Sequence, residues 1–396
     1  MLLSGGNYLI YLQNLIHILM CYKQSARGNL MKKIGFVLRD LSLAGGTEKC
    51  FSLLANQLVR FYDVKAISYY YFDDIFYPLD SKISLENVFP KKGGYRERHI
   101  LLPRYYSKIR SFLSDCDVII FVSSASSLGL IATLGWKNKL IITWEHTSLV
   151  NEMYLTKKRR LLQYLSVKLS NVCVQLTKYN EEIAKKKWGG SHNIVTIYNP
   201  IDDGLFNNNV QCNIESKHIV TLSRIDRVKG LDLLVKVAAK VLKKHPDWKW
   251  DVFGQCTDID YERELKAEIA KSGVEEQLIF HVPVKDIGTV LKNSSIYVMT
   301  SYYEGLPMSL LEAKAYGVPI VAFDCPTGPN EIILDGQNGD LIACYDTDDM
   351  AKKICDLIEN INKRKEYQAM SKIGMDKFSM ISVIKKWKEL IDGIEV

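Results

Sequence analysis

Short apolar segments alternate along most of the chain with longer segments whose apolar positions recur every three or four residues. The short segments predict strands and the longer ones predict helices. In the first half, the predicted strands are 34–38, 64–71, 117–122, 140–144, 171–176 and 193–198. The clearest helix is 47–61, where we expect Thr47 to cap the first turn and Glu48 to complement its positive end. This alternation is typical of a doubly wound α/β domain.

The pair Asn199-Pro200 and a polar connector interrupt the alternation, which then begins again. The second half has predicted strands at 218–222, 248–254, 277–282, 296–300 and 319–323, and predicted helices at 230–244, 260–272 and 307–317. A last helix is predicted over 378–394. The pattern therefore predicts a second α/β domain. Ligands bind at the carboxyl ends of strands in open α/β sheets, so we expect a cleft where the two domains face each other.

We divide the chain into an extension (1–30), a first domain (31–198), a second domain (199–377) and a C-terminal helix (378–396). The apolar run at 8–22 is short and interrupted by polar residues, which argues against a transmembrane helix. It also lacks the basic start and cleavage site of a signal peptide. We interpret the extension as lying outside the natural protein, with an amphipathic helix at a membrane surface as the alternative.

The cysteines and the charge distribution limit the function further. Nine cysteines are dispersed, with no C-x-x-C pair and no histidines beside them, which argues against a zinc site or a redox pair and suits free thiols in a reducing cytoplasm. Residues 1–200 carry 27 Lys and Arg against 14 Asp and Glu, while residues 201–396 carry 25 against 31. Basic clusters at 91–99, 157–160 and 185–188 favour an anionic partner, although solvated helix faces are the alternative.

Two loops of the sequence are suited to binding an anion. Gly45 and Gly46 stand between the first predicted strand and helix, where free backbone N–H groups can meet a phosphate; an ordinary tight turn is the alternative. Arg224 and Lys229 follow the first strand of the second domain. An arginine fork and a lysine ammonium at such a position can hold a diphosphate.

The segment EGLPMSLLE carries two acids, Glu304 and Glu312, in largely apolar surroundings. Glu304 falls in the loop after a predicted strand. Pro307 suits the first position of the next helix, and Glu312 then lies inside that helix. A carboxylate can accept hydrogen bonds from two neighbouring hydroxyls, such as those of a ribose.

The pattern E-G-x-P-x-x-L-x-E, with R-x-x-x-x-K upstream and G-G-T-E near the start, resembles the retaining glycosyltransferases of family 4. The resemblance extends over residues 31–396. It implies the GT-B fold, an α/β architecture in which two Rossmann-like doubly wound domains face a central cleft. It also implies that the last helix packs back on the first domain.

The resemblance assigns the nucleotide to four positions. Glu312 would hold the ribose hydroxyls. Arg224 and Lys229 would hold the diphosphate, together with the backbone amides at Gly46.

The resemblance assigns the donor sugar to four further positions. Glu304 would lie beside the sugar, with the backbone of Gly305 and Leu306 near sugar and phosphate. His146, in the stretch WEHTS at the end of a predicted strand, matches a family histidine that reaches the sugar near the reaction centre. We therefore assign catalytic roles to His146 and Glu304.

The stretch CPTGPNEII (325–333) looks like the version found in bacterial enzymes that build capsule, O-antigen or teichoic-type glycans. We expect transfer of a hexose or N-acetylhexosamine from a UDP-sugar, with retention and without a metal or other cofactor. The D-x-D triplets at 115–117 and 258–260 precede a strand and open a helix, so we interpret them as structural. The expected acceptor is a polyprenyl-diphosphate-linked glycan, at the anionic inner face of the cell membrane, with no nucleic acid involved.

Three alternatives stay open. The stretch VPVKD (282–286) lacks the glycine that many relatives carry there, which leaves a GDP-sugar donor possible in place of a UDP-sugar. A UDP-sugar 2-epimerase shares the GT-B fold but needs no acceptor. A non-catalytic membrane or nucleic-acid-binding protein would explain the basic half, but would leave the acids and cations of the cleft without a shared purpose.

Overall fold

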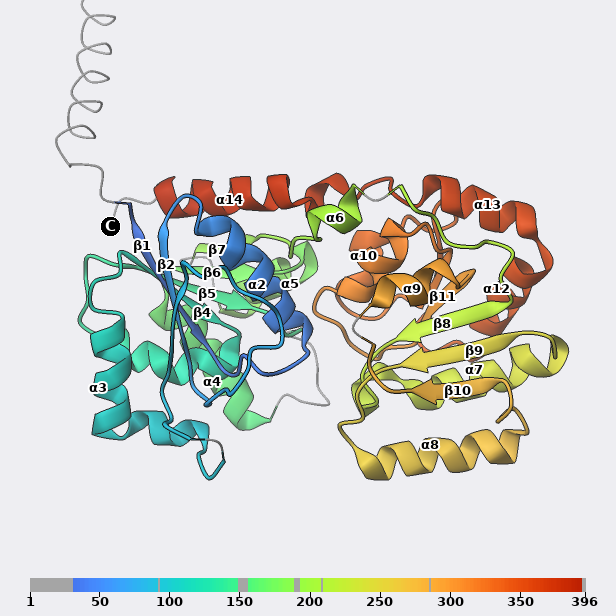
Figure 1. Ribbon diagram of the computed structural model, residues 1–396, viewed down its shortest axis with the longest axis horizontal. Coiled ribbons are helices and arrows are strands. Elements are labelled where there is room, and N and C mark those ends of the chain that lie inside the picture. The colour runs from blue at the N-terminus through green and yellow to red at the C-terminus, as the bar shows by residue number, and fades with distance from the viewer. Residues whose placement is uncertain are drawn as a thin grey trace, which may run out of the picture.

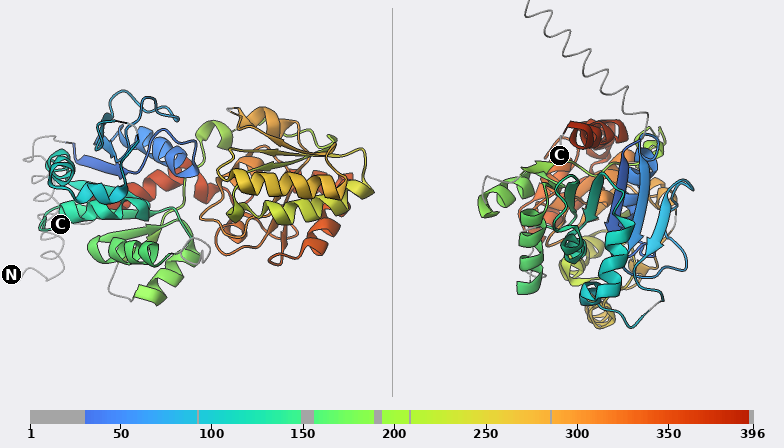
Figure 2. Two further views of the ribbon diagram at one scale, coloured as in Figure 1. Left: turned by 90° about the horizontal axis from the view of Figure 1, so that it is seen from below. Right: turned by 90° about the vertical axis from the view of Figure 1, so that its left-hand side faces the viewer.

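The computed structural model describes residues 31–91, 93–148, 156–188, 193–207, 209–284 and 286–393. Two parallel sheets occupy opposite ends of an elongated molecule, and helices surround each of them (Figures 1 and 2). The predicted extension at 1–30 lies outside the described residues. Among the residues described, no helix combines the length and apolar character needed to cross a membrane.

The first sheet has the strand order β3-β2-β1-β4-β5-β6-β7, and all its pairs are parallel. Its strands are β1 (Lys33–Leu38), β2 (Asp63–Ser68), β3 (Ser84–Asn87), β4 (Val118–Val122), β5 (Leu140–Glu145), β6 (Val172–Gln175) and β7 (Asn193–Thr196). The inner strands β4, β5 and β6 are buried throughout, as expected of strands covered on both faces. The edge strand β3 is half exposed and has no apolar run, which explains why the sequence did not predict it.

Helices and 3₁₀ turns connect these strands: α2 (Gly46–Leu58), η1 (Glu97–Leu101), α3 (Pro103–Phe112), η2 (Ser124–Thr133), α4 (Lys157–Leu169) and α5 (Lys178–Trp188). Gly45 is the N-cap of α2, and no side chain caps this helix. The prediction that Thr47 caps it was therefore wrong, because Thr47 already lies inside the first turn. Glu48 lies in that first turn, as predicted.

The second sheet has the order β10-β9-β8-β11-β12-β13, again with parallel pairs only. Its strands are β8 (His218–Leu222), β9 (Lys249–Phe253), β10 (Leu278–His281), β11 (Ile296–Met299), β12 (Ile320–Phe323) and β13 (Asp340–Ile342). In both sheets, therefore, the first strand along the chain lies in the interior of the sheet. The next strands are added on one side of it and the later strands on the other, so the order of the strands reverses beside it. This is the doubly wound order, which opens a crevice at the reversal.

The second half contains more helices than the sequence predicted. They are α6 (Asp203–Phe206), η3 (Arg227–Lys229), α7 (Leu231–Lys244), α8 (Ile259–Ser272), α9 (Ile287–Lys292), α10 (Met308–Ala315), α11 (Pro329–Ile332), α12 (Thr347–Glu359), α13 (Ile361–Met370), η4 (Asp376–Phe378) and α14 (Met380–Gly393). Helices α7 and α8 lie on one side of the sheet, and α9 and α10 on the other (Figure 1). Pro307 is the N-cap of α10 rather than its first residue, a shift of one position from the prediction.

The last helix, α14, runs back along the first domain (Figure 1). Its Trp387 is fully buried, and the Trp387 ring lies 5.3 Å from the ring of Trp144 in β5. At the far end of α14, the hydroxyl of Tyr62 donates a hydrogen bond of 2.9 Å to Asp392. The second domain is thus tied to the first both by the chain connection and by a packed C-terminal helix.

We predict that Trp387→Ala lowers the free energy of unfolding by about 3–5 kcal/mol, because it removes a large buried side chain from the joint between α14 and β5. Urea unfolding followed by circular dichroism measures this loss. The control is Ile381→Ala on the same helix, where the side chain is 81% exposed and the change should stay within about 0.5 kcal/mol. Equal effects of both variants would contradict the role of Trp387.

Candidate active site

A cleft of about 1190 Å³ opens between the two domains and is lined by residues of both. It lies where the loops that follow the carboxyl ends of the strands meet. All the residues that the sequence predicted for the site line this cleft: Gly46, His146, Arg224, Lys229, Glu304, Gly305, Leu306 and Glu312. The structure therefore brings together positions that are up to 266 residues apart along the chain. Their chemical roles remain predictions.

On the first-domain side, Gly46 begins α2 directly after the loop that follows β1. Glu48, one position beyond Thr47, also lines the cleft. Burial raises the pKa of Glu48 to about 7, and nearby Asp40 adds to the rise while Arg224 opposes it. A substantial fraction of this carboxyl is therefore neutral at physiological pH. From the sequence, Glu48 was expected only to complement the positive end of α2.

His146 follows β5 and is half-buried beside Trp144, with 4.4 Å between the ring centroids. Burial lowers the pKa of His146 to about 3, so its imidazole is neutral at physiological pH. In the part of the chain that the structure describes, His146 Nε2 has no hydrogen-bond partner. The residue lines the cleft, and a neutral imidazole can donate a hydrogen bond from one ring nitrogen and accept one at the other.

Gly305 lets the second domain approach His146 closely. A Cβ atom at Gly305 would lie 2.5 Å from the carbonyl oxygen of His146, a separation that real Cβ atoms do not show. Any larger residue would push the two walls of the cleft apart. This requirement explains the glycine in the motif after Glu304.

The cations of the second domain lie at the carboxyl end of β8, as predicted. Lys229 Nζ donates to Glu304 Oε1 at 2.7 Å, and the Ser301 hydroxyl donates to the same oxygen at 2.6 Å. Arg224 forms an ion pair of 2.9 Å with Asp226 and keeps 55% of its side chain exposed. Arg224 is thus accessible from the cleft, while Lys229 and Glu304 form a fixed pair at its floor.

The loop at 325–329 supports the floor of the cleft from behind. Thr327, with a φ of 74°, donates a hydrogen bond from its hydroxyl to the carbonyl oxygen of Glu304. Gly328, with a φ of 98°, packs against Pro307. Through these two residues, the stretch CPTGPNEII packs behind the loop that carries Glu304 and holds its backbone in place.

Glu312 lies inside α10 with only 9% of its side chain exposed. Its Oε1 accepts a hydrogen bond from Nζ of Lys49, which belongs to α2 in the first domain. The sequence prediction missed Lys49. The available signal was its spacing of three from Gly46, which places both on the same face of α2.

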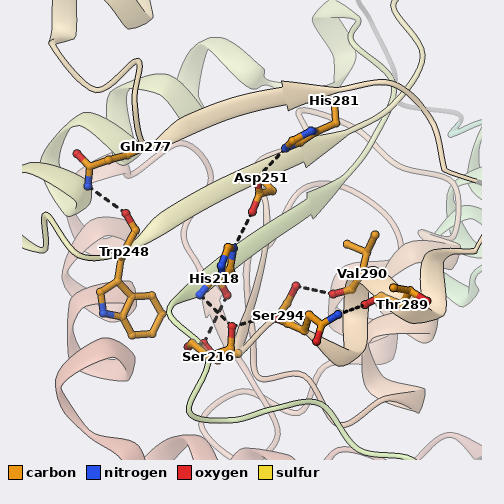
Figure 3. Close-up of polar contacts among 11 residues, drawn as sticks. Ser216, His218, Trp248, Asp251, Gln277, His281, Thr289, Val290 and Ser294 are labelled. Carbon is orange, nitrogen blue, oxygen red and sulfur yellow. Dashed lines mark hydrogen bonds and ion pairs between the residues drawn. The ribbon is translucent and has the colours of Figure 1, made fainter.

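Phe253, the last residue of β9, lines the cleft. The ring of His281 stacks on Phe253 with 4.4 Å between centroids. Asp251 holds His281 in turn, at 2.7 Å from Nε2, and it also contacts Nδ1 of His218 at 2.9 Å (Figure 3). This chain of polar contacts across β8, β9 and β10 supports the cleft wall from outside. Pro283, within the stretch that lacks the expected glycine, also lines the cleft.

The D-x-D triplets lie outside the cleft. Asp115 contacts Lys33 and Lys65 near the amino ends of β1 and β2, away from the carboxyl ends that face the cleft. Asp258 caps α8 by accepting a hydrogen bond of 3.0 Å from the backbone of Tyr261. Within the described ranges, no group of three His, Cys, Asp or Glu side chains is placed to hold a metal ion.

A family model described as glycosyl transferases group 1 matches residues 207–374, which cover most of the second domain. An uncharacterized glycosyltransferase of Haemophilus influenzae is 29% identical over 91% of this chain and 100% of its own length. The amylovoran biosynthesis glycosyltransferase AmsD of Erwinia amylovora is 26% identical over 91% of this chain and 100% of its own length. The chain is a glycosyltransferase.

A third relative of the glycosyltransferase, from Campylobacter jejuni, is named as an α-1,4-N-acetyl-D-galactosaminyltransferase acting on a diNAcBac-PP-undecaprenol-linked glycan. It is 23% identical over 92% of this chain and 99% of its own length.

Solved structures show the same fold as the glycosyltransferase. Staphylococcus aureus TarM, with UDP bound, has a TM-score of 0.77 at 18% identity and covers 91% of this chain and 100% of its own. Anabaena HepE, with UDP-glucose, has a TM-score of 0.76 at 17% identity over 91% of this chain and 100% of its own. The predicted GT-B fold is therefore confirmed. The predicted enzyme class is confirmed by the family model and the named relatives.

We predict that replacing His146 of the glycosyltransferase by Asn makes the free energy of unfolding less dependent on pH under acidic conditions. The unfolded chain binds a proton at His146 below pH ~6.5, but the folded chain does not until about pH 3. Between pH 6 and 4, the free energy of unfolding therefore falls more steeply with decreasing pH in the wild type than in His146→Asn. The difference in slope is about 1.4 kcal/mol per pH unit. Urea midpoints measured across this range test it, and parallel curves would contradict a neutral, buried His146.

Proposed function

We propose that this glycosyltransferase is a retaining enzyme of the family 4 type. It moves a hexose or N-acetylhexosamine from a UDP-sugar to a lipid-linked or growing glycan in bacterial surface-polysaccharide synthesis. One observation carries the proposal: cations, acids and a helix N-terminus from two domains line a single cleft. The names of the relatives from Erwinia amylovora and Campylobacter jejuni support the pathway, and UDP in TarM and HepE supports the donor.

In the proposed mechanism, the bond between the anomeric carbon and the diphosphate breaks, and negative charge develops on the leaving group. Arg224 and Lys229 lie at the end of β8, and the N–H groups at Gly46 begin α2. Positive groups placed in advance where charge develops stabilise a transition state strongly. We propose that these groups suffice without a metal ion.

The new bond forms between the anomeric carbon and a hydroxyl oxygen of the acceptor, on the face that the diphosphate leaves. The hydroxyl proton passes to an oxygen of the leaving phosphate. Glu304, fixed by Lys229 and Ser301, lies beside the donor sugar in this arrangement. The neutral imidazole of His146 exchanges a hydrogen bond with a sugar hydroxyl.

Two other activities differ from this one in what they need. A GDP-sugar donor would place guanine in place of uracil against Phe253 and Pro283, where the expected glycine is missing. A nucleotide-sugar 2-epimerase would turn over its substrate without any acceptor. Product analysis with and without a glycan acceptor separates the epimerase from the transferase.

Thermal unfolding tests the donor. We expect one UDP-sugar among UDP-glucose, UDP-galactose and the UDP-N-acetylhexosamines to raise the unfolding midpoint, also in EDTA, because a ligand that binds only the folded state stabilises it by about 2.7 kcal/mol at 100 times its Kd. The rise should vanish in Glu312→Ala and Arg224→Ala.

The matched control for these variants is Lys240→Ala, which removes an exposed cation that pairs with Asp348 far from the cleft. It should keep the full response to the UDP-sugar. A rise in the unfolding midpoint with GDP-mannose alone would show that the donor is a GDP-sugar and not a UDP-sugar. A response that requires a metal would contradict the metal-independent mechanism, and no response to any nucleotide sugar would remove the donor site.

We also propose that the enzyme works in the cytoplasm at the inner face of the cell membrane, where a polyprenyl-diphosphate-linked acceptor is held. The support is the net basic first half and its exposed cations, which include Arg159 and Arg160 on α4 and Lys186 and Lys187 on α5. Such a surface is attracted to anionic lipid, and the attraction weakens with salt.

Co-sedimentation with vesicles tests this proposal. We expect binding to phosphatidylglycerol vesicles at low salt, weaker binding at 0.5 M salt where the screening length is only about 4 Å, and none to phosphatidylcholine vesicles. Lys186→Glu with Lys187→Glu should weaken it. Arg263→Glu with Lys271→Glu, an equal charge change on the exposed face of α8, should not. A protein that ignores anionic vesicles at low salt would contradict the proposal.

A further inference from the structure

A lysine of the first domain contacts the carboxylate that we assign to the ribose. Lys49 lies in α2 and Glu312 in α10, and Nζ of Lys49 donates a hydrogen bond to Oε1 of Glu312. Both side chains line the cleft, and they are 23% and 9% exposed. This ion pair crosses from one domain to the other at the proposed donor site.

The surroundings of Glu312 explain why it needs a cationic partner. Its neighbours in α10, Leu311 and Ala313, are fully buried. The charge of Glu312 also contributes to raising the pKa of the nearby Tyr297 and Tyr316. A carboxylate in such a place is strongly unfavourable unless a cation compensates its charge. Lys49 supplies that cation from the other domain.

Lys49 keeps its charge in this setting. Burial lowers the pKa of Lys49, but the charge of Glu312 and the hydrogen bond to it outweigh burial and leave the pKa above its usual value. Lys49 is therefore an ammonium at physiological pH.

The position of Lys49 on α2 connects it with the anion site. Gly46 and Lys49 are three residues apart, so they lie on the same face of the helix. That face presents backbone N–H groups at its start and an ammonium one turn later. In a bound nucleotide, the diphosphate and the ribose follow each other in the same order.

We propose that Lys49 is a donor-positioning residue. By holding Oε1, it fixes the carboxylate of Glu312 in the orientation that receives the two ribose hydroxyls. An ionised carboxylate has about four acceptor sites, so one lysine hydrogen bond leaves enough of them for both hydroxyls. This inference rests on the proposed function, and specifically on Glu312 as the ribose ligand.

The opposite possibility makes the opposite prediction. If Lys49 instead occupied the site that the ribose needs, the nucleotide would have to displace it, and removal of Lys49 would tighten binding. If Lys49 of the first domain instead orients Glu312 of the second, tight binding of the ribose depends on Lys49.

The test is calorimetric binding of UDP and 2′-deoxy-UDP to the whole chain. Lys49→Met should weaken UDP binding about tenfold, the effect of losing one hydrogen bond to a charged group. It should also reduce the preference for UDP over 2′-deoxy-UDP, a readout that general loosening of the fold would not change. Lys49→Arg, which keeps the charge, should restore most of both. Lys49→Met should add little to Glu312→Gln, because Lys49 acts through Glu312.

The matched control is Lys240→Met, which removes an exposed lysine paired with Asp348 at 2.7 Å and should bind UDP as the wild type does. Unchanged or tighter UDP binding by Lys49→Met would overturn the proposal. Equal weakening toward UDP and 2′-deoxy-UDP would overturn it too, because the loss would not act through the ribose. A wild-type chain that binds neither UDP nor any nucleotide sugar would instead overturn the proposed function on which the inference rests.

Discussion

The active cleft depends on the parallel direction of every strand pair in both sheets and on the reversal of strand order beside the first strand of each. Parallel strands deliver all their carboxyl-end loops to one edge, and the reversal separates two neighbouring loops to leave a crevice. Gly46 follows β1 at the first reversal, and Arg224 and Glu304 follow β8 and β11 at the second. The predicted site residues therefore gather where the topology leaves room for a ligand.

The two crevices form one site only because the domains are held facing each other. Trp387 of α14 packs on Trp144 next to His146, and Tyr198 donates a hydrogen bond of 2.7 Å to Glu331 of α11. Gly305 meets the carbonyl of His146 without a side chain between them. Close contacts at the cleft floor and a packed helix along its outer side thus set the width of the site.

The electrostatic design of the cleft follows from its burial. Two of its acids are held by cations and a third is partly neutral: Glu304 pairs with Lys229, Glu312 pairs with Lys49, and Glu48 has a pKa raised to about 7. Arg224 remains accessible. An accessible arginine beside paired acids can bind an anionic group, as the proposed nucleotide-sugar donor requires.

The sequence by itself determined the strands that are buried on both faces, the helices with a clear apolar face such as α7, and eight of the residues that line the cleft, since each of these leaves a local pattern or a spaced motif. It did not predict the half-exposed edge strand β3 or the helices α12 and α13. It also misassigned the cap of α2, because Gly45 and Thr47 are equally plausible until the backbone is known. Only the tertiary structure decided the partner of Glu312: Lys49 lies 263 residues away, and no periodicity or spacing connects residues that meet only when two domains face each other.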